Sequence, residues 1–361
     1  MSSNPTPSLR ASRPDEIAPG DHYWTKASRD LRHRLNQAIP HEVLKELHRK
    51  SPARHLFVAA RQFLLLAAAS WAAWRFPQPW IWIPAALVSG WTVFNFTVLL
   101  HEVVHHTIFD KRHATAERVL GFLYAIPSGI SASQFTRWHL DHHAELGSDE
   151  DDPKRHHLSP KVNARWYKLL YCTPALFPIY FRAARRESST YPAPLQRAIA
   201  LERKGSMLFH LSALGAIWYL FGFGPALRAS IIPVFFVFPI AFTLNRLGQH
   251  YDIDPTHPLK WSTVMAPSRL WDFLFVYSNY HAEHHYFPSV PFYNLRKLHL
   301  RLRPLYAELG IQTHTYREIV WEWFVKNRPP HADWDKADRG DQPPATGSSA
   351  ERKDPVSGRA A

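Results

Sequence analysis

Histidines gather in three short segments of this chain, and within each segment their spacing is that of metal ligands. The segments read HEVVHH, HLDHH and HAEHH, and they contain His101, His105 and His106, then His139, His142 and His143, then His281, His284 and His285. Residues three or four positions apart lie on one face of an α-helix, so each segment presents at least two imidazoles on the same side. Imidazole nitrogens are suitable ligands for iron, zinc and copper.

The number of imidazoles indicates two metal ions rather than one. Two HxxHH triplets and the pair His101 and His105 together supply more ring nitrogens than a single ion uses. A ligating histidine usually donates its second ring N–H to an acceptor. Acidic residues near the histidines offer such acceptors: Glu102, Asp141, Asp151, Asp152 and Glu283. Isolated histidines, such as His299, are interpreted as packing residues.

These segments must be held together by the elements between them, and the sequence predicts that those elements are membrane helices. Crossing a bilayer takes about 20 mainly apolar residues. Four stretches approach that length: 56–76, 80–100, 206–224 and 229–245. Arg61 in the first stretch and Pro233 in the last are tolerated if the arginine reaches the interface and neighbouring helices satisfy the freed backbone. We therefore expect an all-α polytopic membrane protein with four transmembrane helices in two hairpins.

The order of the spans predicts that the three histidine segments meet on one side of the membrane. The first two segments follow the first hairpin, and the second hairpin separates them from the third. Two crossings return the chain to the side from which it left. The turns inside the hairpins are nearly uncharged, whereas the segments outside them are rich in Lys and Arg. The positive-inside rule therefore places both termini and a helical cap that carries the histidines in the cytoplasm.

Composition sets further limits on the class of protein. The chain has 361 residues, a formal net charge of +13 and one cysteine, Cys172. A single cysteine excludes disulfide frameworks, cysteine-ligated iron–sulfur clusters and cysteine-rich zinc sites. The basic residues flank apolar spans, so we expect no nucleic-acid partner. We divide the chain into a polar segment with an interfacial helix (1–52), a membrane domain (53–330) and a disordered tail (331–361).

The three segments resemble the histidine boxes of the membrane fatty acid desaturase family, which also includes acyl and carotenoid hydroxylases. The third box continues as NYHAEHHYFPSVPFYNLRKLH, and the resemblance extends over about residues 56–309. It implies two ligands from box one without His106, three from each other box, and one more before box three, where NRLGQHYD offers His250. The implied metal ligands are His101, His105, His139, His142, His143, His250, His281, His284 and His285. The chain departs from the family in placing Asn245 five residues before His250 instead of four, which leaves Gln249 as the other polar candidate.

The resemblance also implies the chemistry. Two Fe²⁺ ions would reduce O2 to an oxidant that removes two hydrogens from a fatty-acyl chain and leaves a double bond. The histidines would act as ligands, and we expect no other catalytic or cofactor-binding residue. The substrate would be a membrane lipid or an acyl carrier, and electrons would come from a ferredoxin, a rubredoxin or a cytochrome b5-like protein. Aromatic residues beside the boxes are candidates for the substrate tunnel or for the core: Trp138, Trp271, Phe275, Tyr277 and Tyr280.

Three alternatives stay open at this point. A hydroxylase or ketolase of the same superfamily, acting on a carotenoid, sphingolipid or fatty acid, begins with the same C–H abstraction, and only its product differs. HEVVH also matches the HExxH motif of zinc proteases, in which the glutamate is the general base; this reading leaves boxes two and three without a role. A membrane metal carrier would bind metal without consuming O2.

Overall fold

The computed structural model of the chain describes residues 22–148, 151–153, 162–251 and 257–329. The predicted disordered tail lies outside these residues. Within them every regular element is helical, and the one β-type contact is a bridge between Met265 and His314. The all-helical expectation is therefore confirmed for this part of the chain.

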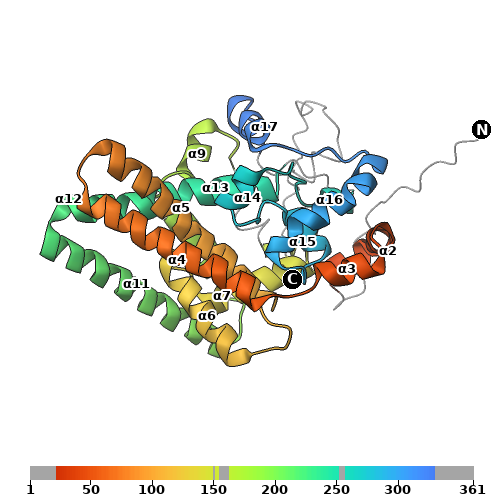
Figure 1. The fold of residues 1–361 in the computed structure, drawn as a ribbon, viewed down its shortest axis with the longest axis horizontal. Coiled ribbons are helices and arrows are strands. Elements are labelled where there is room, and N and C mark those ends of the chain that lie inside the picture. The colour runs from red at the N-terminus through yellow and green to blue at the C-terminus, as the bar shows by residue number, and fades with distance from the viewer. Residues whose placement is uncertain (1–21, 149–150, 154–161, 252–256, 330–361) are drawn as a thin grey trace, which may run out of the picture.

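In chain order the elements are α1 (Tyr23–Ala27), α2 (Arg29–Ala38), α3 (His41–Leu47), α4 (Pro52–Arg75), α5 (Pro79–Val104), α6 (Ala114–Ser128), α7 (Ala132–Ala144), α9 (Arg165–Leu170), α10 (Leu176–Ser188), α11 (Ala193–Phe221), α12 (Phe223–Ala226), the π-helices η2 (Leu227–Ile231) and η3 (Pro233–Val237), α13 (Phe238–Gln249), the 3₁₀-helix η4 (Pro258–Lys260), α14 (Arg269–Leu274), α15 (His281–Tyr286), α16 (Phe292–Glu308), α17 (Tyr316–Val320) and the π-helix η5 (Trp321–Val325). Figure 1 shows the long helices gathered in one lobe and the shorter helices α14 to α17 in another.

Among the described residues, three helices are long and apolar enough to cross a membrane: α4, α5 and the continuous helix Phe223–Gln249, which joins α12, η2, η3 and α13. They contain the predicted spans 56–76, 80–100 and 229–245. α5 is the central one, because 67% of its most apolar window is buried against 22% in α4 and 33% in Phe223–Gln249. α4 and α5 form a hairpin joined by a short turn (Figure 1).

The fourth predicted span, 206–224, lies mostly in α11, which does not meet the same hydropathy criterion. α11 has 29 residues, which makes it about 44 Å long at 1.5 Å per residue. Ile199 is its one buried residue, and much of its surface consists of exposed apolar side chains such as Leu208 and Leu220. The second predicted hairpin thus exists as two long helices, of which one has the composition of a membrane span.

Prolines are accommodated in Phe223–Gln249 by a change of helix type. Pro233 has no backbone N–H and would clash with the carbonyl four residues earlier in an α-helix. The segments η2 and η3 around it are π-helical, and single π-turns of this kind occur where an α-helix must admit an irregularity. The span therefore continues to Gln249, directly before His250, without a break.

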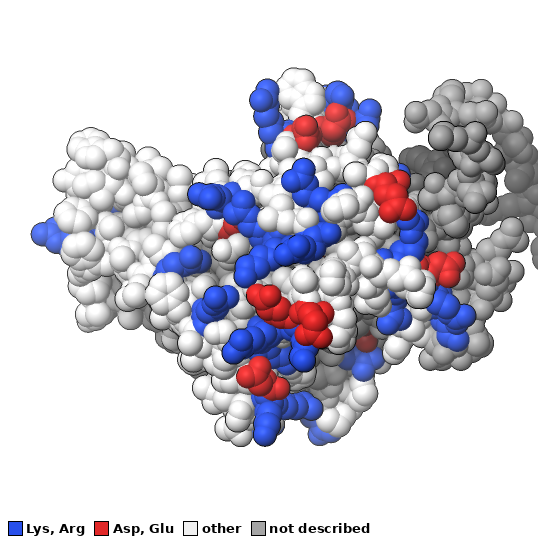
Figure 2. Space-filling view, turned by 45° about the vertical axis from the view of Figure 1, so that its right-hand side comes forward, with Lys and Arg blue, Asp and Glu red and all other residues white. Residues whose placement is uncertain are grey.

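Charge divides the surface as it divides the sequence. On the face shown in Figure 2, the far ends of the long helices are almost free of charged side chains, whereas Lys and Arg, with some Asp and Glu, gather over the rest of the molecule. Many large apolar side chains are exposed on these helices, Leu64, Trp80 and Leu220 among them, and contiguous exposed apolar surface is typical of interaction or membrane surfaces. The long helices have the surface expected of helices that contact lipid, and the chain is a membrane protein on these grounds together with its apolar helices.

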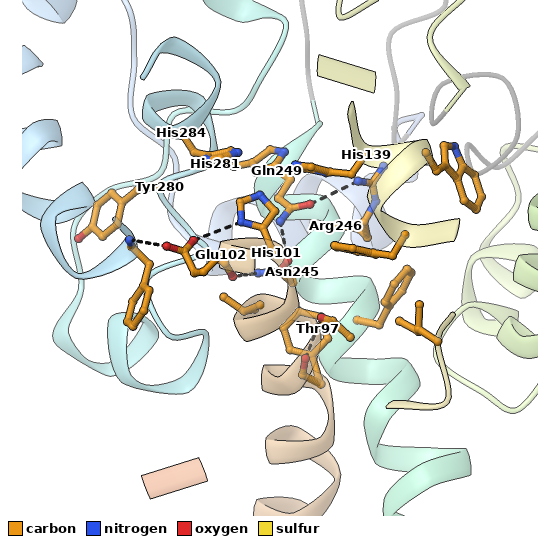
Figure 3. A pocket seen from close by; sticks show the side chains of 18 of the residues that line it. Thr97, His101, Glu102, His139, Asn245, Arg246, Gln249, Tyr280, His281 and His284 are labelled. Carbon is orange, nitrogen blue, oxygen red and sulfur yellow. Dashed lines mark hydrogen bonds and ion pairs between the residues drawn. The ribbon is translucent and has the colours of Figure 1, made fainter. Parts of the chain in front are cut away.

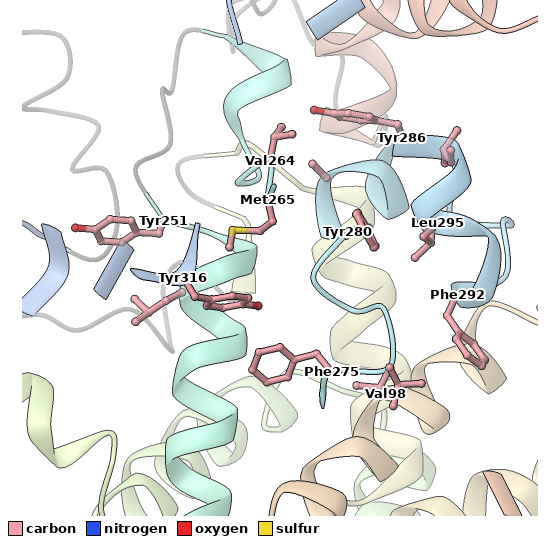
Figure 4. Packing of buried hydrophobic residues seen from close by; sticks show 14 of the residues in the cluster. Val98, Tyr251, Val264, Met265, Phe275, Tyr280, Tyr286, Phe292, Leu295 and Tyr316 are labelled. Atoms are coloured by element: carbon pink, nitrogen blue, oxygen red, sulfur yellow. The ribbon is translucent and has the colours of Figure 1, made fainter. Parts of the chain in front are cut away.

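One large apolar core joins α5 and α13 to α15 and α16. Its buried residues include Phe275, Tyr280 and Leu295 (Figure 4). The N-terminal segment, predicted to carry one interfacial helix, forms three short helices, α1, α2 and α3. Leu31 and Leu35 of α2 are buried in this same core. The N-terminal segment therefore covers the lobe that carries the histidines.

We predict that Gly90→Ala destabilises the protein, because α5 and η3 touch at this residue. A Cβ on Gly90 would lie 2.4 Å from the Pro233 carbonyl oxygen and 2.5 Å from the Val237 Cβ. Overpacking of this kind costs about 1–3 kcal/mol, and the expected result is a lower Tm in detergent. Gly215→Ala in α11 is the control, since nothing lies within 4 Å of its Cβ. Equal Tm values for the two variants would contradict the close contact.

Candidate metal centre

Five histidines from three helices bring ring nitrogens to one place. His101 and His105 come from the end of α5, His139 and His143 from α7, and His284 from α15. One ring nitrogen from each lies within 4.8 Å of the others. His105 Nε2 is 2.7 Å from His139 Nε2, and His284 Nε2 is 3.0 Å from His143 Nε2. We call these five residues group one.

Four further histidines form a second cluster, all of them buried. Group two consists of His142 from α7, His250 at the end of α13, and His281 and His285 from α15. His250 Nε2 lies 3.1 Å from both His142 Nε2 and His281 Nε2. The two groups are adjacent, because the rings of His143 and His285 have centroids 4.2 Å apart. Together they contain all nine of the histidines singled out from the sequence.

The two HxxHH boxes divide their ligands between the groups in opposite ways. Box two sends its i, i+4 pair, His139 and His143, to group one and His142 to group two. Box three sends its i, i+4 pair, His281 and His285, to group two and His284 to group one. Residues four apart lie above one another on a helix, and the residue at i+3 is offset around the axis. α7 and α15 therefore each face both groups.

Hydrogen bonds on the outer side of group two determine which nitrogens carry protons. His142 Nδ1 lies 2.8 Å from the Asp152 carboxylate, and His250 Nδ1 lies 3.1 Å from the carbonyl oxygen of Trp261. Both partners are acceptors, so both Nδ1 atoms carry the N–H, and in neutral rings the Nε2 atoms then present lone pairs. Two such lone pairs facing each other at 3.1 Å repel unless a cation lies between them. The donor set therefore suits a metal ion.

The spacing agrees with that conclusion. Metal–imidazole bonds of about 2 Å place ligands on opposite sides of one ion about 4 Å apart. The spread of nitrogens within each group is of that order. Two clusters of imidazoles, each compact enough for one ion, are compatible with a centre of two metal ions.

The predicted acceptors behave differently from one another. Asp152 contacts His142, as above, and one oxygen of Glu102 lies 3.3 Å from His101 Nδ1. Asp141 pairs instead with Arg137, and Asp151 with Ser148. Among the described residues, neither Asp141 nor Asp151 accepts a hydrogen bond from a histidine of the two groups.

Glu283 lies within box three but bonds away from both groups. One of its oxygens accepts from His299 Nδ1 at 2.6 Å and from the Tyr306 hydroxyl at 2.8 Å. Glu283 and His299 are completely buried. Burial beside this carboxylate raises the pKa of Tyr306, which keeps its proton and donates it to the bond. His299 is thus a packing residue, as predicted, that ties α15 to α16.

His106 stands outside both groups, in agreement with its exclusion from the predicted set. It follows the end of α5 with a positive φ of 53°, and its Nδ1 lies 2.8 Å from Glu117 Oε2. The ring is thereby held on α6, away from the convergence of the other histidines.

A pocket lies directly against the histidine groups, between α5, α7 and α13. Its empty volume is about 880 Å³, which includes space open to the solvent. The histidines that face it are His101, His139, His281 and His284, and most of its other walls are apolar, with Phe94, Val98, Phe242 and Leu295 among them. Figure 3 shows this pocket with the histidines along one side. The pocket thus combines apolar walls with histidines of both groups.

The candidate aromatic residues separate into two sets. Trp138 and Tyr280 line the pocket. Trp271, Phe275 and Tyr277 do not line it. The rings of Trp271 and Phe275 stack on each other, and both contact the Tyr316 ring at a tilted angle in the core. Core packing is therefore the role of the second set.

Sequence reasoning missed two features of the site. One is the Trp261 carbonyl on His250, which no residue-type pattern marks because every residue has a carbonyl. The other is Arg246, which lines the pocket next to Gln249. A charged residue near the end of an apolar span is a signal that was available.

Comparison with known proteins identifies relatives over the part of the chain that contains the histidine groups. A family model described as fatty acid desaturase matches residues 77–317, which include all nine histidines. Sphingolipid delta(4)-desaturase/C4-monooxygenase DES2 of Homo sapiens is 28% identical over 278 residues, covering 72% of this chain and 76% of the human protein. The protein of the same name in Bos taurus is 26% identical over 324 residues, covering 84% and 90%. Sphingolipid delta(4)-desaturase DES1 of Drosophila melanogaster is 25% identical over 264 residues, covering 68% and 74%.

We predict that Asp152→Asn weakens metal binding by about 10–100-fold, the usual effect of losing a carboxylate that orients a ligating histidine. The carboxylate holds His142 in the tautomer whose Nε2 lone pair faces group two. The measurement is a titration of Fe²⁺ against a competing chelator. Asp151→Asn is a matched control one residue away, because Asp151 contacts Ser148 and no histidine of the groups. Equal Fe²⁺ affinities of the two variants would contradict the orienting role of Asp152.

Proposed function

The chain belongs to the fatty acid desaturase family, and on that premise we propose that it is an O2-dependent di-iron enzyme that introduces a double bond into the hydrocarbon chain of a lipid. The observation that carries the proposal is the pair of histidine groups along the wall of an apolar pocket. Pocket and groups share His101, His139, His281 and His284. A substrate chain in this pocket lies against the residues that would hold the metal.

The nine histidines would hold the two ions, group one around one ion and group two around the other. When bound, the iron pair supplies the reduction of O2 and the abstraction of hydrogen from an unactivated carbon, which no side chain can perform. The protein contributes positioning. Asp152 and Trp261 fix the tautomers of His142 and His250, and the apolar walls exclude water from the reacting carbon.

Hydroxylation of the chain is the second candidate outcome. The human relative is named both a desaturase and a C4-monooxygenase, and both reactions begin with removal of one hydrogen. The zinc-protease alternative loses its support. Its general base would be Glu102, whose Oε2 accepts from the Thr107 hydroxyl at 2.6 Å and from the Phe292 N–H at 3.1 Å. Glu102 instead joins the end of α5 to the start of α16.

We also propose that α11 is a fourth crossing and that the cap faces the cytoplasm. α11 begins beside α7, where Glu202 accepts bonds from Ser131 and Ser133. It ends at Gly222, after which Phe223–Gln249 leads back to His250. At that far end, Arg228 donates to the carbonyl oxygens of Ala73 and Trp74 at the end of α4. α11 thus covers the same depth as two helices that meet the membrane criterion.

The electron donor would approach the charged lobe. Lys and Arg gather there (Figure 2), which suits an acidic partner such as a ferredoxin, a rubredoxin or a cytochrome b5-like protein. An approach from this side leaves the apolar lobe in the membrane.

The first test is the product made by the chain in a heterologous host. We predict that host lipids gain a double bond, seen by gas chromatography–mass spectrometry, and that His284→Ala abolishes it while the protein still reaches the membrane. His106→Ala is the control and should retain product, because His106 bonds Glu117 outside both groups. Hydroxylated lipid with no new double bond would replace the desaturase proposal with the second candidate.

The second test addresses the crossings by cysteine labelling. Replacing the single cysteine, Cys172, by serine provides the background; its burial raises the pKa of its thiol to about 11, so the native residue itself reacts poorly. We predict that cysteines at Gln78 and Phe223 react with an impermeant maleimide in intact cells, and that one at Arg301 reacts only after lysis. Labelling of Phe223 only after lysis would contradict a crossing by α11.

A further inference from the structure

The pocket beside the histidine groups contains an arginine, where a plain hydrocarbon chain requires only apolar contacts. Arg246 lies in the last turn of α13, and together with Asn245 and Gln249 it lines the pocket. Phe242, one turn earlier on the same helix, belongs to the apolar part of the wall. Along α13 the wall therefore becomes polar toward His250 of the candidate metal centre.

The polar side chains are connected in one direction. Arg246 donates to Gln249 Oε1 at 3.3 Å, and the Gln249 amide donates to Asn245 Oδ1 at 2.8 Å. The Asn245 amide then donates to the Ser278 hydroxyl oxygen at 2.7 Å. Figure 3 shows the bonds among Arg246, Gln249 and Asn245. Both amide oxygens are thus used as acceptors within the protein.

Arg246, the first donor in this series, has more N–H groups than the series uses. A guanidinium has five N–H groups and no acceptor, and Arg246 uses one of its nitrogens on Gln249. Among the described residues no carboxylate lies within ion-pair distance of Arg246; Asp152 attracts it only from farther away and is bonded to His142. The neutral imidazoles bring no negative charge. A largely enclosed cation without a counter-charge is costly.

We propose that Arg246 binds an oxygen at the polar end of the lipid substrate, and that this end enters the pocket instead of staying at the membrane surface. The oxygen is an acceptor: an amide carbonyl, a hydroxyl or a carboxylate. Such a bond supplies the partner that the guanidinium lacks, and Gln249 orients the guanidinium toward it. This inference rests on the proposed function, since it names the part of the substrate that the same pocket recognises.

The position of Arg246 determines which carbon reacts. Arg246 precedes His250 of group two by four residues, which is about 6 Å along a helix, and the His250 N–H still bonds the Arg246 carbonyl at 3.1 Å. Because four histidines of the two groups line the same pocket as Arg246, a lipid whose polar end is held by Arg246 presents carbons near that end to the candidate metal centre. Arg246 is thus a specificity-determining residue for lipids oxidised close to their polar end.

The test compares the binding of three radiolabelled probes to detergent-purified protein: N-stearoyl-sphinganine, stearate and octadecane. The wild-type chain should bind at least one oxygen-bearing probe about 10–100-fold more tightly than Arg246→Met does, the usual effect of a hydrogen bond to a charged group. Octadecane should bind both proteins equally, which shows that the pocket is intact. The probe that loses affinity identifies the oxygen as that of an amide lipid or of a carboxylate.

Arg203→Met is the matched control. Arg203 is a partly buried arginine that donates to a glutamine, Gln134, outside the pocket, and its loss should leave all three affinities unchanged. If Arg246→Met does not elute as a single species, Arg246→Gln, which keeps a polar group against Gln249, replaces it.

Equal affinities of the wild type and the Arg246 variant for both oxygen-bearing probes overturn the inference. Because binding is measured without turnover, this result is separable from a failure of the proposed function. If the chain oxidises no lipid but Arg246→Met still loses affinity for an oxygen-bearing probe, the proposed function is wrong and the binding role of Arg246 stands. If the chain forms product but Arg246→Met keeps its affinity for both oxygen-bearing probes, the function stands and the binding role of Arg246 is wrong.

Discussion

The main constraint on this fold is that it brings the ring nitrogens of nine histidines close together, where their lone pairs repel one another. Outer hydrogen bonds fix His142 and His250 so that their Nε2 atoms face each other at 3.1 Å. Similar approaches occur in group one. Metal ions bound among these nitrogens would remove that repulsion, and the free energy of metal binding would then be part of the free energy of folding. The long helices, the cap and the N-terminal cover serve to hold this arrangement.

The location of the candidate site was predictable because two sequence patterns occur next to each other. The HxxHH spacing places imidazoles on one helix face, and apolar stretches of membrane length bring distant parts of the chain to one level. Together they identified the nine histidines that the structure brings into two groups. They also located three helices of membrane type. α11 differs because Lys204 and His210 dilute its apolar run, and tertiary context rather than composition defines its course.

Other features of the site could not be predicted from the sequence, because they depend on how the helices pack. The division of each box between groups depends on how α7 and α15 face each other, which is a property of packing. The Trp261 carbonyl carries no sequence signal. Glu283 looked like a partner for the ligands beside it, but on a helix neighbouring residues point about 100° apart, and its side chain meets His299 and Tyr306 of α16. Adjacency in sequence was a poor guide to contact there.

The opposite division of the two HxxHH boxes has a consequence for how the protein is made. Each ion would need ligands from α7 and from α15, and between these helices the chain runs through α11 and Phe223–Gln249. Neither ion would be fully enclosed until those helices are in place and α15 has been synthesised. Metal capture would therefore be a late step of biogenesis, and a nascent chain stalled before residue 281 would expose an incomplete set of imidazoles. Quality control of such chains by chaperones and proteases would act on this intermediate.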